Sequence, residues 1–164
     1  MKMTEVFHCS WTEDSDATCT AASEQKFFGA NGLTVDQKRD LVFVNDPIDH
    51  KITVMRRDRE TGRLTKESEI ILPVHADNIE YDDEADEIIM GTIFDFEDVL
   101  KKFNGENIAV AGGLSVARKK DGWKVDHILN HDGTKLSQIS AGARFRNKVV
   151  LGSPFSEGIL VCFV

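Results

Sequence analysis

The chain has 164 residues, of which 41% are hydrophobic and 29% are charged, a composition typical of one globular domain and not of a disordered segment. Its 28 acidic and 20 basic side chains give a net charge of −8, which repels phosphate backbones, so we expect no nucleic acid partner. No stretch approaches the roughly 20 apolar residues that cross a bilayer, and the first residues lack the apolar region of a signal peptide, so we expect a soluble, uncleaved chain.

A short hairpin is expected at the beginning of the chain. Residues 7–10 and 18–22 read as strands around a turn near Asp14, which places Cys9 opposite Cys19. A disulfide between them is geometrically allowed if the side chains are suitably oriented, and unpaired buried cysteines are the alternative. With Cys162 the chain has three cysteines, so one thiol is left over whatever pairs.

Short apolar runs bounded by turns then predict strands along the rest of the chain. The runs are LTVD (33–36), LVFVN (41–45), KITVM (51–55), SEIIL (68–72), NIEYD (78–82) and EIIMG (87–91), followed by LSVARKK, WKVDHIL, NKVVLGS and GILVCFV. One short helix is expected at 95–103, with Asp95 as its N-cap and Asn104-Gly105 as its end.

The strands belong to an internal repeat. The segment NGLTVD from Asn31 aligns with DNIEYD from Asp77, 46 residues later, and a weaker copy, QISAGARFRNKVVLGS, follows after about 61 residues. Four short strands per repeat predict an all-β fold, a β-propeller of about three four-stranded blades. We expect one partial propeller domain over 1–164, with blades at about 1–25, 30–72, 77–130 and 137–164. Because three blades do not close a ring, a longer protein, association of copies or an open arc are the alternatives.

Asn31, Asp77 and Asn78 lie at equivalent points of neighbouring repeats, just before the innermost strands. In a propeller these connections reach one mouth of the central channel, so their side chains are expected to face a common point. Carboxylate and carboxamide oxygens suit a hard cation such as Ca²⁺. Turn formation is the alternative, because Asn-Gly and Asp-Asn are common turn dipeptides. His75 is the histidine expected nearest to this mouth.

Several segments resemble the second half of the paraoxonase/arylesterase family, which consists of six-bladed propellers that hydrolyse esters and lactones. The resemblance runs from about Val6 to the C-terminus and rests on FFGANGLTVDQKRDLVFVND, LPVHADNIEYD, IIMGT and DGTKLSQISAGARFRNKVVLGSPFSEGILVCFV, in family order.

The resemblance implies that Asn31, Asp77 and Asn78 hold a catalytic calcium ion, with Asp77 also as a candidate base. It also implies that Cys162 matches a C-terminal cysteine that, in secreted members, pairs with one near the N-terminus, in a part of the family's chain that precedes this one. The family's other calcium ligands and its histidine dyad belong to blades that have no counterpart here. Where the family often has Gly-x-His-Pro, this chain has GTIF at 91–94, which predicts an apolar wall in the pocket.

Two functions are therefore predicted. The first is calcium-dependent hydrolysis of carboxylic esters or lactones, at a site that a second copy or an N-terminal half would complete. The second is a non-catalytic half-propeller that binds a partner or self-associates through its open blade edges. The family resemblance suggests an extracellular or membrane-associated protein, although no signal peptide is seen.

Overall fold

The computed structural model describes residues 3–119 and 122–163; residues 1–2, 120–121 and 164, which fall within the expected blades, lie outside this part. Within it, the regular structure is β-strand apart from one short helix. The elements are β1 (Phe7–Ser10), β2 (Thr18–Ala21), β3 (Leu33–Asp36), β4 (Leu41–Asp46), β5 (Lys51–Arg57), β6 (Leu64–Ile71), β7 (His75–Asp82), β8 (Glu87–Ile93), α1 (Phe96–Phe103), β9 (Gly112–Lys119), β10 (Trp123–His131), β11 (Ala141–Phe145), β12 (Lys148–Gly152) and β13 (Leu160–Phe163).

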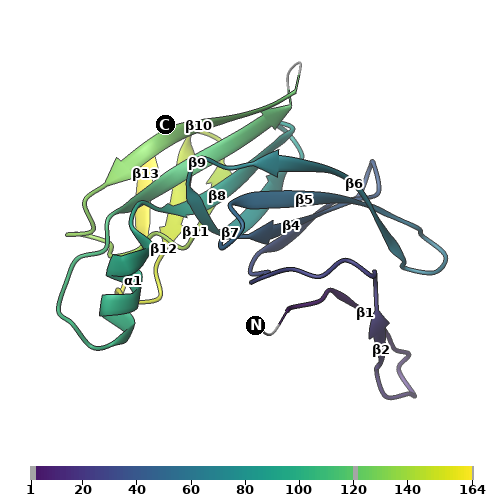
Figure 1. The fold of residues 1–164 in the computed structure, drawn as a ribbon. Coiled ribbons are helices and arrows are strands. Elements are labelled where there is room, and N and C mark those ends of the chain that lie inside the picture. The colour runs from purple at the N-terminus through teal and green to yellow at the C-terminus, as the bar shows by residue number, and fades with distance from the viewer. Residues whose placement is uncertain (1–2, 120–121, 164) are drawn as a thin grey trace.

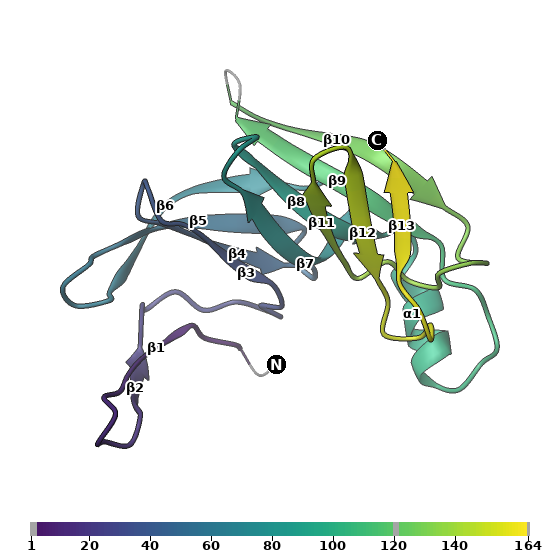
Figure 2. The same cartoon turned by 180° about the vertical axis from the view of Figure 1, so that it is seen from behind.

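The strands form antiparallel sheets that follow one another in chain order (Figures 1 and 2). They are β1-β2, the four-stranded sheets β3-β4-β5-β6 and β7-β8-β9-β10, and β11-β12-β13. The first strands of neighbouring sheets contact each other, β3 with β7 and β7 with β11. This arrangement confirms the prediction of an all-β fold that corresponds to part of a β-propeller.

The repeat corresponds to a turn that is built in the same way in two successive sheets. Between β3 and β4, Oδ1 of Asp36 accepts hydrogen bonds from two backbone N–H groups of the turn, and Asp82 does the same between β7 and β8. Each turn closes on an aspartate with positive φ, Asp40 at 55° and Asp86 at 54°. Aspartate is among the few residues other than glycine that tolerate this backbone region, which explains why the D-x3-D spacing recurs.

Apolar clusters lie between the sheets and hold them together. Phe43 of the first four-stranded sheet packs in one cluster with Ile88 and Met90 of the second. Ile89, on the opposite face of β8, packs in another cluster with Leu151 of the third sheet. Because alternate residues of β8 point to opposite faces, a continuous apolar run serves both clusters.

Helix α1 forms where the sequence predicts it. Asp95 is the N-cap and its side chain accepts a hydrogen bond from the Glu97 N–H at 2.8 Å, while the N–H of Asn104 donates to Leu100 at the other end. Val99 anchors the helix on the sheet beside Ile93. No helix in the described ranges is long and apolar enough to cross a membrane.

Several strands extend beyond their predicted runs, and β6 and β7 differ most at their starts. β6 begins at Leu64 and not at residue 68. The residues that follow Leu64 are polar and exposed, so no apolar run marks this part of the strand in the sequence. β7 begins at His75 instead of 78, so Asp77 and Asn78 lie inside a strand and not in the connection before it.

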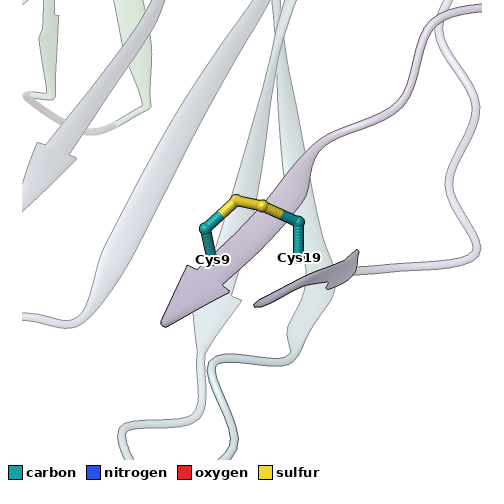
Figure 3. Close-up of a disulfide and its surroundings, with 2 residues drawn as sticks. All are labelled: Cys9 and Cys19. Carbon is teal, nitrogen blue, oxygen red and sulfur yellow. A yellow bond between two sulfur atoms is a disulfide. The ribbon is translucent and has the colours of Figure 1, made fainter. Parts of the chain in front are cut away.

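The N-terminal hairpin forms, with Cys9 directly opposite Cys19 in the register of β1 and β2. The two cysteines are joined by a disulfide, which settles the alternative that the sequence left open (Figure 3). Cys162 of β13 is a free, half-buried thiol, so the pairing that the family resemblance implies stays a prediction.

Candidate functional site

Three polar side chains from three successive sheets meet at one point. Asn31, just before β3, donates its Nδ2 proton to Oδ1 of Asp77 over 2.6 Å. Gln138, just before β11, donates from Nε2 to Oδ2 of the same carboxylate over 3.3 Å. Each oxygen of the Asp77 side chain therefore accepts a hydrogen bond from the amide group of a neighbouring sheet.

A β-bulge presents Asp77 and Asn78 at this point, because β7 leaves its register with β8 between Ala76 and Ile79. The bulge is held by Asn45 of the preceding sheet, which is fully buried. Its Nδ2 group donates to the main-chain oxygens of Ala76, at 2.7 Å, and of Asp77, at 2.6 Å. One side chain of β4 thus donates to two main-chain carbonyl groups at the bulge.

Asp77 is only 8% exposed. Burial raises the pKa of its carboxyl group, because the charged form loses hydration, and the hydrogen bonds from Gln138 and Asn31 oppose that rise. No basic side chain is among the groups that shift this pKa. In the part of the chain that the structure describes, the site therefore contains a buried carboxylate with amide donors and no compensating positive charge.

A cavity of about 380 Å³ opens beside these residues, and its polar end includes Asn31, Asp77, Asn78 and Gln138. Asn78 is exposed; its side chain donates to the Ser140 carbonyl oxygen at 3.2 Å, and its main-chain N–H donates to the same oxygen at 2.9 Å. The structure thus brings all three residues predicted from the sequence to one cavity.

The rest of the cavity lining is mainly apolar, and much of it comes from α1. Phe96, Val99, Leu100 and Phe103 line it, together with Ile93 at the end of β8. Of the GTIF segment, Ile93 lines the cavity and Phe94 is not among the lining residues, so this segment contributes one apolar side chain and α1 contributes most of the others.

Gln138 was not among the predicted site residues. Asp77 lies 46 residues after Asn31, and Gln138 lies 61 residues after Asp77. The weaker third copy of the repeat begins with Gln138, so the repeat marks its position but not its role. Its role was missed because the third copy has Gln138-Ile139 where the other copies have Asn-Gly and Asp-Asn.

His75 does not line the cavity. Its Nδ1 lies 3.0 Å from the Pro47 carbonyl oxygen, and its ring packs between His50, with centroids 3.9 Å apart, and Phe96, at 5.3 Å. These contacts give His75 a supporting position under the start of α1.

The donor atoms at the polar end determine which ligands it can hold. Among the residues that the structure describes, no three His, Cys, Asp or Glu side chains converge in a way that could hold a metal ion. A cation at this cavity would therefore depend on amide oxygens around the single carboxylate of Asp77. Such an all-oxygen set matches hard cations and not zinc or copper.

Comparison with protein-family models matches residues 16–162 to the model described as Arylesterase. Comparison with curated proteins gave no match.

Proposed function

The chain belongs to the arylesterase family, and from this premise we propose that it hydrolyses carboxylic esters or lactones at the cavity beside Asp77, with Ca²⁺ as its cofactor. Family membership supports ester hydrolysis in general. The observation that carries the proposal is that Asn31 and Gln138 both donate to the buried carboxylate of Asp77, at a cavity whose other lining is mainly apolar.

Calcium fits the residues that are present. Asp77 supplies a carboxylate, and Asn31 and Asn78 supply amide oxygens at the same cavity. These are fewer than the six to eight oxygens that calcium takes, so water, substrate or a second chain would supply the others. Bound there, Ca²⁺ would polarise the substrate carbonyl and stabilise negative charge on its oxygen.

The chain's own side chains have distinct roles in this proposal. Phe96, Leu100 and Phe103 bind the apolar part of the substrate and keep water away from it. Asp77 lies at the polar end of the same cavity, where its carboxylate accepts the proton of the attacking water. Asn31 keeps that carboxylate in place through its hydrogen bond.

The test is hydrolysis of phenyl acetate and of a δ-lactone, with calcium and with EDTA. We expect turnover that requires calcium and is abolished by Asp77→Asn. Asp83→Asn is the matched control, because Asp83 is an exposed aspartate of the β7–β8 turn, with half of its side chain accessible. Turnover that survives EDTA, or that Asp77→Asn leaves unchanged, would contradict the proposed site.

A second candidate function, self-association through an open blade, is favoured by the outer face of β11–β13. Val150 is 36% exposed, although it is the repeat equivalent of Phe43 and Ile89, which are buried beneath the following sheet. Val161, at 47%, and Phe163, at 73%, extend this apolar face across β13. The equivalent faces of the two four-stranded sheets are each covered by the sheet that follows them.

We propose that a second copy covers it, and sedimentation velocity tests this. A dimer that Val161→Lys converts to a monomer supports association through β13. A monomer at all concentrations, with or without calcium, contradicts self-association. The next experiment would then add a separate N-terminal half of the propeller and test whether it binds this face.

A further inference from the structure

We propose that Gln138 is an additional ligand of the cation, so that three successive sheets contribute oxygen-bearing side chains to it. The inference rests on the proposed function, because it concerns the same calcium site. It assigns a role to a residue outside the set Asn31, Asp77 and Asn78.

The first observation is positional. Asn31, Asp77 and Gln138 are separated by the two intervals of the internal repeat, 46 and 61 residues. Each lies at or just before the first strand of its sheet, β3, β7 and β11. Gln138 is therefore, in the third sheet, the counterpart of the residues that the other two sheets direct at this point.

The second observation is an incomplete set of hydrogen bonds. Gln138 is 4% exposed and lines the cavity. Its Nε2 donates to Asp77, but its Oε1 is buried without a hydrogen-bond partner among the described residues. Buried amide oxygens are ordinarily satisfied, so an oxygen left open at a cavity next to a carboxylate indicates a missing positive or hydrogen-bearing group.

The third observation is that the backbone fixes this side chain in place. Gln138 has φ of 54°, a left-handed conformation that residues other than glycine rarely adopt. Its main-chain N–H donates to Val110 at 2.9 Å, and Val110 in turn donates to Oγ of the neighbouring Ser137 at 3.0 Å. Because these bonds do not involve Asp77, the loop presents Gln138 to the cavity independently of what binds there.

The chemistry requires only a rotation of the terminal amide. A carboxamide carries its donor nitrogen and acceptor oxygen on the same carbon, and half a turn exchanges them. With no cation, the nitrogens of Gln138 and Asn31 face the carboxylate and stabilise its charge. A cation beside the carboxylate reverses the preference, and the two oxygens then turn toward it.

The experiment measures metal binding directly in the full chain, with Tb³⁺ as a luminescent probe and Ca²⁺ as its competitor. Gln138→Leu, which keeps the size and removes the oxygen, should weaken binding about 10-fold to 100-fold, the range found when groups that support a metal site are removed. Gln138→Glu, which replaces the amide by a carboxylate, should strengthen it. Gln25→Leu is the control, because Gln25 is a half-buried glutamine outside the cavity, and its side chain donates to the main-chain oxygen of the adjacent Lys26.

The luminescence lifetime in H₂O and in D₂O separates a ligand from a side chain that merely positions Asp77. If Gln138 contacts the ion, Gln138→Leu adds one water molecule to the bound Tb³⁺. Circular dichroism melting, together with the Gln138→Glu variant, identifies a substitution that only unfolds the protein.

Three outcomes are distinguishable. Weaker binding with an added water supports the inference. Unchanged affinity and an unchanged number of waters in Gln138→Leu overturn it while leaving the calcium site of the proposed function in place. Absence of Tb³⁺ and Ca²⁺ binding in the unsubstituted protein overturns both.

Discussion

Asn45→Ala should destabilise the fold, because one buried amide holds the bulge on which Asp77 is displayed. Its Nδ2 group donates to two carbonyl groups, those of Ala76 and Asp77, and the residue is fully buried. Leaving a buried carbonyl unsatisfied costs about 1–3 kcal/mol, and the substitution leaves two. The Asn45 Oδ1 atom is itself buried without a partner in the described part of the chain, so its removal returns about the energy of one such group. The net expected loss is that of one such group, about 1–3 kcal/mol.

Urea unfolding in EDTA, followed by circular dichroism, measures this loss. Asn147→Ala is the matched control, because Asn147 is exposed and substitutions at such sites usually change stability by less than about 0.5 kcal/mol. Asn45→Asp should be worse than Asn45→Ala, since a buried carboxylate has no proton to donate and would face two carbonyl oxygens. A loss below about 0.5 kcal/mol for Asn45→Ala, or an Asn45→Asp protein as stable as Asn45→Ala, would refute the reasoning.

Three further predictions concern the site, the packing of the sheets and the hairpin. Because burial raises the pKa of Asp77, the folded protein holds this proton more tightly than the unfolded chain, and stability falls as pH rises from the unfolded value of 3.8 through the folded one. In EDTA, Asp77→Asn should therefore raise the urea midpoint at pH 7, with the difference vanishing as the pH falls through that range; an equal midpoint at pH 7 would contradict this. Gly91→Ala should cost about 1–3 kcal/mol in the same assay, because a Cβ at Gly91 would overlap the Ser140 main chain of the next sheet, and a neutral effect would show that the sheets can separate freely. Reduction of the Cys9–Cys19 disulfide should expose the hairpin to limited proteolysis while leaving the main melting transition in place, because an isolated two-stranded hairpin is marginal in water; loss of the main transition would mean that the bond supports the larger sheets.

The fold was predictable because each strand and turn of its repeat is determined by residues that are close together in the sequence. Short apolar runs mark the strands, and the Asp36 and Asp82 turns require the same residue types at the same spacing. A pattern that is fixed by neighbouring residues can be recognised without knowledge of the tertiary structure. The meeting of Asn31 with Asp77 followed from the same repeat, because equivalent positions of adjacent blades lie side by side.

The bulge and the third residue of the site were not predictable in this way. Asn45 bonds to residues 31 and 32 positions away, and no local pattern indicates that its side chain replaces a strand hydrogen bond. Gln138 keeps only its position in the repeat and none of the residue chemistry of Asn31 or Asp77. Long-range hydrogen bonds of single side chains depend on how the sheets stack, which sequence periodicity does not specify.

The site concentrates polar groups that weaken the fold that carries it. Asp77 is a carboxylate without a basic partner, and both Asn45 and Gln138 have a buried side-chain oxygen without a hydrogen bond in the described residues. The apolar clusters on either side of the second sheet, around Phe43 and Ile89, offset this cost, because they bury large side chains completely. Asp77 and Gln138, whose burial reduces stability in the metal-free protein, are also groups that a bound cation would satisfy, so binding and stability should be coupled at this site. The calcium-induced shift in melting temperature then measures how much stability the bound ion restores to these buried polar groups.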